Sequence, residues 1–388
     1  MYVQQMRRAP RRLAALVISN SVLLPIGACI ALAWANLAAE SYEAFASRMH
    51  FVVNDVGMTL FFALAAKEIV EAAAPGGSLH PVTKAITPLI AAVGGMVIPA
   101  SIYLVLVTVT GEHDLARGWA IPLATDIAFS FLVARWLFTR THPAIPFLLL
   151  LAIADDAMGL VVLALFYPSA AVRPVDFAVI LAVSLTICWL LRRRRVMDVW
   201  PYVAIGGSLA WVAFFRGGLH PALALVPVVP FLPHGRHDAG LFEEPHRPAN
   251  DPLSRFERTA RVPAEIVLFL FGLANAGVAF TRMGAGTWMV AAALIVGKPF
   301  GIFLAAVVGH LFGISSSTIN RRDLFVVGCV AGIGFTVALF FCTAAFPDGD
   351  LLDQTKIGAL LSFAAAAVAT IAAWLLRVGR FAPVSRTS

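Results

Sequence analysis

Long apolar segments alternate with short polar ones along almost the entire chain. Most of these segments are about 18–25 residues long, which matches the length a helix needs to cross a hydrocarbon core of about 30 Å. Twelve spans are predicted, near residues 13–36, 52–72, 86–110, 119–138, 144–167, 175–192, 199–216, 219–233, 264–281, 288–311, 324–346 and 355–377. The pattern therefore predicts an all-α polytopic membrane protein with about 12 transmembrane helices.

No segment outside these spans resembles a soluble module. The longest connection, residues 234–262, is rich in proline, histidine and charge, and it joins two apolar halves without the pattern of a domain. Residues 1–388 are therefore interpreted as a single transmembrane domain with its core at about 13–378. Any function must be located within the membrane part.

Basic residues gather in alternate connections between the spans. One set of connections carries Arg7, Arg8, Arg11 and Arg12, then Lys84, Arg140, residues 192–195, the 234–262 loop, Arg321, Arg322, Arg377 and Arg380. The other set is poor in Lys and Arg. Because Lys and Arg are retained on the cytoplasmic side, this alternation predicts a multi-pass protein with both termini in the cytoplasm.

The composition supports the same interpretation. The chain is 60% hydrophobic and only 13% charged, whereas soluble domains carry about 25% charged residues. The excess of 29 Lys and Arg over 22 Asp and Glu lies in short connections, which favours orientation in a lipid bilayer over a nucleic-acid partner. The four cysteines lie in or beside apolar spans and form no metal or disulfide framework, so no cofactor is expected.

Four charged residues lie near the middle of predicted spans. Asp126, Asp155, Asp156 and Lys298 all lie in apolar surroundings, where each charge costs about 2.5–3.5 kcal/mol at the bilayer centre. Lys298 lies too far inside its span for its ammonium group to reach the interface, so it requires a buried carboxylate partner. These residues are the candidates for the functional site.

The adjacent pair Asp155 and Asp156 suits two tasks better than one. Neighbouring positions on an α-helix differ by about 100° around the axis, so the two carboxylates cannot face the same partner. If one pairs with Lys298, the other can face a water-filled cavity and hold either a small cation or a proton. Competition of the two for one carboxylate, combined with alternating access, produces cation/proton exchange.

Five segments carry a resemblance to a known family. They are AIPLATDIAFS (120–130), LAIADDAMGLVVLALFYP (151–168), GLANAGV (272–278), VGKPFGI (296–302) and VAGIGFTVALF (330–340). In this order they resemble the bacterial sodium/proton antiporters of the NhaA type, over about residues 10–378. The resemblance implies inverted repeats with two discontinuous helices that cross at mid-membrane, here broken at Thr125-Asp126 and at residues 332–334.

The resemblance also implies an activity and a role for each residue. The implied activity is exchange of cytoplasmic Na+ or Li+ for external H+, serving pH and sodium homeostasis, and the implied protein is not an enzyme. Asp156 would be the principal ion and proton carboxylate, and Asp155 and Thr125 would contribute to the same site. Asp126 would offset the positive helix ends at the breaks, and Lys298 the negative ones.

The chain departs from the family pattern at three places. Between the first two helices, LAAESYEAFASRMHF replaces a longer insertion that forms a β-hairpin, so a homodimer would lack the usual hairpin contact. Glu68 matches a pH-regulatory glutamate, but the basic pair that follows it in relatives is absent. Glu257 is retained, whereas Arg258 and Arg261 replace frequent histidines. We therefore expect pH activation to be weaker than in relatives or shifted.

Two alternatives remain open at this point. The same fold could exchange another monovalent cation, such as K+. An intramembrane aspartyl protease would also need two membrane aspartates, for which Asp126 and Asp155 could serve. However, the Gly-x-Gly-Asp signature of those proteases is absent before Asp126, and Lys298 has no evident use in proteolysis.

Overall fold

The computed structural model describes residues 23–74, 77–79, 82–139, 141–233, 251–313 and 319–382, and the regular elements within them are all helical. The longer helices are α2 (Leu23–Leu37), α3 (Ala39–His50), α4 (Met58–Ala73), α5 (Val82–Thr110), α6 (Ile127–Leu137), α7 (Ala144–Phe166), α8 (Pro174–Arg193), α9 (Ser208–Gly217), α10 (Pro252–Asn275), α11 (Ala285–Ala292), α12 (Lys298–Leu311), α13 (Arg321–Ala331), α14 (Phe335–Ala345), α15 (Asp350–Leu361) and α16 (Ala364–Leu376). The shorter π- and 3-10 helices are η1 (Phe51–Gly57), η2 (His113–Leu123), η3 (Tyr202–Gly207), η4 (Pro221–Leu223), η5 (Val229–Phe231), η6 (Phe280–Arg282), η7 (Ala293–Gly297) and η8 (Gly379–Phe381).

Six of the described helical segments are long and apolar enough to cross a membrane, and eight qualify when each of two bent helix pairs is counted as one span. The first predicted span, 13–36, lies partly outside the described residues, and only its second half is seen, as α2. These helices confirm the prediction of an all-α, multi-pass membrane protein.

The predicted span at 219–233 is wrong. The structure has only the short 3-10 helices η4 and η5 there, joined by turns. Four prolines in this segment, Pro221, Pro227, Pro230 and Pro233, remove backbone donors and prevent a continuous helix. The segment is apolar and mostly buried, but it is not a membrane-spanning helix.

The predicted loop at 234–262 and the span at 264–281 also need correction. Residues 234–250 of that loop lie outside the described residues, and α10 already begins at Pro252. The Asp251 side chain accepts a hydrogen bond from the Ser254 backbone N–H at 2.7 Å, and proline at the first helical position needs no partner. Pro263 lies inside the helix. The charged residues that suggested a loop form the first half of α10.

The short connection predicted at residues 37–51 is itself helical. It forms α3 and passes through the π-helix η1 into α4, so that Ala39–Ala73 is one segment of 35 residues. The Tyr42 hydroxyl donates to the Ala274 carbonyl and accepts from the Gly277 N–H, each at 3.0 Å. This part of the chain is therefore fixed against the end of α10 and forms no hairpin.

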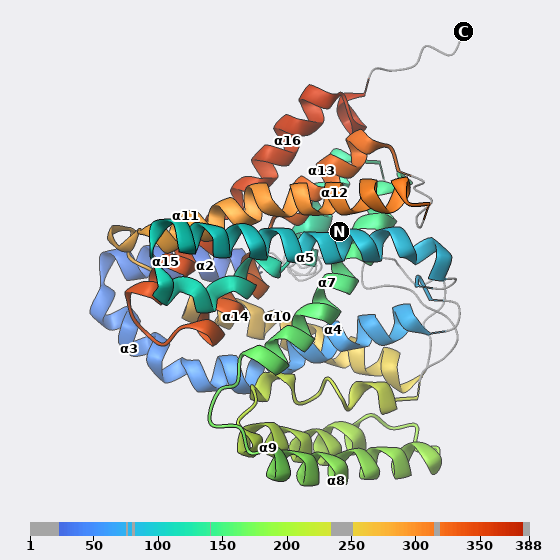
Figure 1. Ribbon diagram of the computed structural model, residues 1–388. Coiled ribbons are helices and arrows are strands. Elements are labelled where there is room, and N and C mark those ends of the chain that lie inside the picture. Colours follow the sequence, from blue (N-terminus) through green and yellow to red (C-terminus); the bar gives the residue numbers. More distant parts are fainter. Residues whose placement is uncertain are drawn as a thin grey trace, which may run out of the picture.

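Close helix packing sets the position of the central elements. Helices α5 and α12 lie side by side across the middle of the molecule, and α8 and α9 form a pair at one edge (Figure 1). A Cβ atom on Gly94 would lie 2.4 Å from the Gly301 carbonyl oxygen, and one on Gly301 would lie 2.3 Å from the Gly94 carbonyl oxygen. Only glycine at both positions allows this approach, which places Lys298 at the start of α12 deep in the bundle.

Candidate functional site

Two broken helices cross at the centre of the protein. One consists of η2 and α6 with a bend of 54°, and the other of α13 and α14 with a bend of 49°. The breaks are joined directly: the Asp126 N–H donates to the Ile333 carbonyl at 2.7 Å, and the Thr125 hydroxyl donates to the Ala331 carbonyl at 3.2 Å. The crossing thus satisfies backbone groups that an unwound membrane helix would leave without partners.

Asp126 lies where two helices begin. Its Oδ1 accepts from the Phe129 N–H in the first turn of α6 at 3.2 Å, and its Oδ2 accepts from the Thr336 N–H in the first turn of α14 at 3.1 Å. The Thr336 hydroxyl also donates to Oδ2. Because helix N-termini carry partial positive charge, one buried carboxylate neutralises both ends. This is the placement that the predicted role of Asp126 requires.

Lys298 pairs with Asp155 in the interior. The Lys298 ammonium lies 3.0 Å from Asp155 Oδ2, and neither side chain is exposed. The same oxygen accepts from the Thr125 hydroxyl at 2.7 Å, and Lys298 also donates to the Leu123 carbonyl at the end of η2. Lys298 thus neutralises both a carboxylate and the negative end of a broken helix. Asp155 Oδ1 accepts no hydrogen bond in the described part of the chain.

Asp156 faces a cavity instead of Lys298. The cavity is bounded by α4, α7, α14 and the end of η2, and both aspartates contribute to its wall. Its other lining residues are mostly apolar, namely Phe61, Phe62, Ala65, Leu123, Ala124, Gly159, Leu160, Leu163, Val337 and Phe341. A carboxylate in this setting has few competing polar partners and is free to bind a small cation or a proton.

A second charged cluster lies at the opposite end of α4 from its junction with η1. Lys67 is 0% exposed, and its ammonium lies 3.0 Å from Glu68, 2.5 Å from Glu71 and 2.9 Å from Glu257 of α10. The three carboxylates are 11%, 13% and 19% exposed. The structure therefore brings the predicted regulatory residues Glu68 and Glu257 together, but through Lys67.

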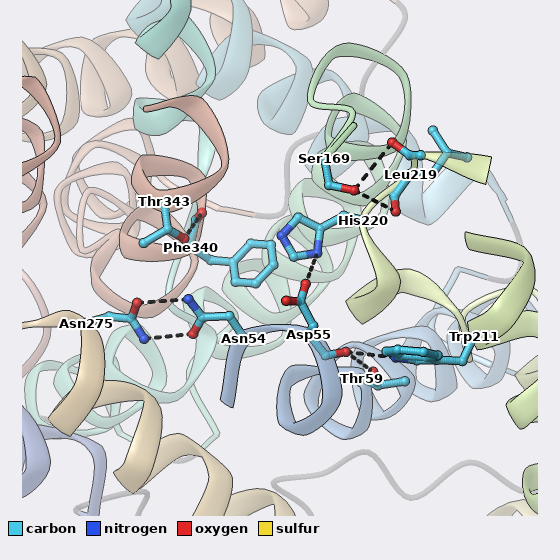
Figure 2. Close-up of polar contacts among 11 residues, drawn as sticks. Asn54, Asp55, Thr59, Ser169, Trp211, Leu219, His220, Asn275, Phe340 and Thr343 are labelled. Atoms are coloured by element: carbon cyan, nitrogen blue, oxygen red, sulfur yellow. Dashed lines mark hydrogen bonds and ion pairs between the residues drawn. The ribbon is translucent and has the colours of Figure 1, made fainter. Parts of the chain in front are cut away.

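A third polar cluster joins η1, α10 and the 219–233 segment. Figure 2 shows Asn54 of η1 and Asn275 of α10 exchanging amide hydrogen bonds of 3.0 and 2.8 Å. In the same view Asp55 approaches His220 at 3.7 Å, and the His220 ring packs on Phe340 with 4.7 Å between ring centroids. These contacts hold η1, α10 and the proline-rich 219–233 segment against α14.

The predicted site residues divide into two groups in the structure. Asp156, Asp155, Thr125, Asp126 and Lys298 come together at the crossing, whereas Glu68 and Glu257 lie in the Lys67 cluster. Their roles in transport stay predictions.

Sequence reasoning missed Lys67 and Thr336. Lys67 could have been found from its position inside an apolar span, with Glu68 next to it and Glu71 one turn later. For Thr336, the only signal was a hydroxyl residue two positions after Gly334.

Comparison with known proteins gives one consistent result. The family model described as Na+/H+ antiporter 1 matches residues 11–375. The chain is 46% identical to Na(+)/H(+) antiporter NhaA 1 of Pelobacter propionicus over 93% of this chain and 97% of that protein. It is 45% identical to Na(+)/H(+) antiporter NhaA of Geobacter sulfurreducens, with the same coverage. The solved sodium proton antiporter MjNhaP1 from Methanocaldococcus jannaschii shares the fold, with a TM-score of 0.57 at 13% identity over 93% of this chain and 92% of that one.

Proposed function

The chain belongs to the Na+/H+ antiporter 1 family, and from that premise we propose that it exchanges Na+ or Li+ for H+ by competition at Asp156. The observation that carries the proposal is the separation of the two adjacent aspartates: Asp155 is bound to Lys298, and Asp156 faces the cavity. One carboxylate is neutralised within the protein and the other is left to the substrate.

The exchange cycle follows from the chemistry of a single carboxylate. A protonated Asp156 is neutral and stable in an apolar cavity, whereas the ionised form needs a counter-ion. A small alkali cation prefers oxygen ligands, and Asp156, together with the unbonded Oδ1 of Asp155 and the Thr125 hydroxyl, supplies them. Binding of the cation releases the proton, and return of a proton on the other side of the membrane releases the cation.

Lys298 keeps the site electrically balanced between these states. Its ammonium holds one negative charge at Asp155 whether Asp156 carries a proton or a cation. If a bound cation draws Asp155 away from Lys298, a second proton can leave the pair, and transport becomes electrogenic. A reversal-potential measurement on reconstituted protein gives the number of protons per cation.

We place the protein in the bacterial inner membrane with both termini in the cytoplasm. The basic residues support this orientation, because the connections rich in Lys and Arg alternate along the sequence with connections poor in them. In this orientation the Lys67 cluster faces the cytoplasm, and the Asp55–His220 pair lies toward the outside.

Reconstituted protein is expected to couple Na+ to an imposed proton gradient. In proteoliposomes with a fluorescent pH indicator inside, added Na+ or Li+ should dissipate the gradient, because each entering cation displaces a proton from Asp156. Absence of a response to any alkali cation between about pH 6 and 9 would contradict the proposal. A response to K+ alone would assign the same fold to potassium exchange. Because the region around Glu68 departs from the family pattern, activation by pH is also expected to be weaker than in relatives or shifted.

The Lys67→Met variant is expected to be destabilised in a pH-dependent way. It leaves three carboxylates close together without a cation, so α4 and α10 repel each other when these groups are ionised. We expect a loss on the order of 2 kcal/mol at about pH 8 that disappears toward about pH 5, where protonation removes the repulsion. The measurement is the melting temperature of the detergent-solubilised protein at both pH values.

Arg282→Met is the matched control for that variant. Arg282 also lies near three acids, Asp353 at 2.7 Å, Glu43 at 3.6 Å and Asp350 at 4.0 Å, but its side chain is 42% exposed. Exposed ion pairs contribute at most about 1 kcal/mol, so this variant should melt near the wild-type temperature. Equal effects of the two substitutions would show that burial does not strengthen the Lys67 cluster.

A further inference from the structure

His142 caps the helix that carries the two site aspartates. Its Nδ1 accepts a hydrogen bond from the N–H of buried Ala144 at 3.2 Å, and its carbonyl accepts from the Ile145 N–H at 3.0 Å. Pro143 and Pro146 bring no N–H, and the Phe147 N–H reaches the Pro143 carbonyl at 3.3 Å. The first turn of α7 is fully satisfied only while Nδ1 of His142 acts as an acceptor.

The other ring nitrogen of His142 faces a carboxylate. Nε2 lies 3.8 Å from Oδ2 of Asp323, which belongs to the first turn of α13. The two side chains are 26% and 17% exposed, so protons from water can reach them. The ring also stacks on Phe138 with 4.8 Å between centroids, which restricts its rotation. His142 therefore has one fixed orientation with two different partners.

Protonation of His142 weakens its contact with the Ala144 N–H and strengthens its contact with Asp323. In the neutral ring, Nδ1 is an acceptor and the hydrogen is on Nε2, whereas in the imidazolium both nitrogens are donors. An added proton thus removes the acceptor for the Ala144 N–H and at the same time strengthens the attraction to Asp323.

We infer that His142 is a proton-binding regulatory site that couples pH on its side of the membrane to the geometry of α7. Helix α7 runs from this cap to Asp155 and Asp156, and α13 runs from Asp323 to Ala331, whose carbonyl accepts from Thr125. The neutral, capping form is the transport-competent one, because it alone satisfies the start of the helix that holds the site. This inference rests on the proposed function, in whose orientation His142 is cytoplasmic.

Other charged groups on the neighbouring elements do not replace this pair. Arg135 of α6 lies over the Phe131 ring at 5.5 Å, and Arg380 of η8 lies over the Trp136 ring at 4.4 Å. Arg321 and Arg322, which precede Asp323 on α13, are exposed. Arg140 lies outside the described residues. Asp323 is thus the carboxylate positioned to stabilise protonated His142.

Two substitutions test separately the hydrogen bond between His142 and the start of α7 and the attraction of protonated His142 to Asp323. His142→Asn keeps a side-chain acceptor that does not titrate, so exchange in proteoliposomes should lose part of its inhibition at acidic pH while its alkaline rate stays within about twofold of wild type. Asp323→Asn removes the group that stabilises the imidazolium, so the midpoint of the pH profile should move about one unit toward acid. A pH profile of His142→Asn identical to that of wild type would overturn the inference.

An independent readout does not depend on transport. The measurement is hydrogen exchange of the backbone amides in the first turn of α7, corrected for the intrinsic pH dependence of exchange. In the wild type these amides should lose protection when His142 is protonated, whereas in His142→Asn their protection should not change. The control is His113→Asn, an exposed histidine of η2, which should change neither measurement. If the wild type shows this change in protection but no Na+ exchange, the proposed function is rejected and the role of His142 as a pH-dependent cap is retained. If protection does not change with pH, the role of His142 is rejected.

Discussion

Asp156→Asn is expected to reduce cation/proton exchange to background. The amide has nearly the shape of the carboxylate, but it neither gains nor loses a proton in the physiological range and offers a cation only one neutral oxygen. The neighbouring Asp155 cannot replace it, because its Oδ2 is held by Lys298 and Thr125. The measurement is Na+-dependent dissipation of a proton gradient in proteoliposomes, together with equilibrium Na+ binding to the purified protein.

Folding and transport can be separated for this variant. Asp156 is half-buried at the cavity and forms no ion pair with a Lys, Arg or His of the described residues, so its replacement should leave the melting temperature unchanged or raise it slightly. Asp176→Asn, at an exposed position in the first turn of α8, is the control and should exchange normally. Wild-type turnover in Asp156→Asn would reassign the carrier to Asp155.

Lys298→Met is expected to destabilise the protein by about 3–5 kcal/mol, because it leaves the Asp155 carboxylate buried without a counter-ion. Thr125 would remain as a hydrogen-bond donor, but one hydroxyl does not replace a full positive charge. The Leu123 carbonyl would also lose its donor. The measurement is the melting temperature and the yield of monodisperse protein in detergent.

The double variant Asp155→Asn/Lys298→Met measures the contribution of the ion pair to stability. It removes both charges, so most of the stability lost in Lys298→Met should return, and the difference gives the coupling energy between the two side chains. Recovery is expected because replacing both members of a buried ion pair is often neutral. If the double variant is as unstable as the single one, the loss comes from packing around Lys298 and the ion pair contributes little.

Much of the site was predictable because charge in an apolar segment is a strong signal. Asp126, Asp155, Asp156 and Lys298 stood out in the sequence, and helix geometry alone showed that the adjacent aspartates face different directions. The structure places Asp155 with Lys298 and Asp156 on the cavity. The sequence argument left open which aspartate had which partner, and the resemblance supplied the assignment.

Other features were predicted incorrectly because the local composition of a segment does not reveal which distant residues it contacts in the folded protein. The charged start of α10 was interpreted as loop, although Glu257 there contacts buried Lys67 on α4. The 219–233 segment was predicted as a helix from its apolar side chains, but its prolines prevent one. His142 and Asp323 lie far apart in the sequence and gave no signal until the starts of α7 and α13 were seen together.

The sequence by itself determined that this is a helical membrane protein and that Asp126, Asp155, Asp156 and Lys298 lie within its apolar spans. Both follow from composition along the chain, since most long apolar segments form helices in lipid and a charge within one is costly unless it has a partner or a function. Only the tertiary structure decided how those charges are shared: Asp126 between two helix starts, Lys298 between Asp155 and a helix end, and Lys67 among three glutamates. The physical reason is that a buried charge is stabilised by atoms within a few ångströms, and only the folded chain brings those atoms together.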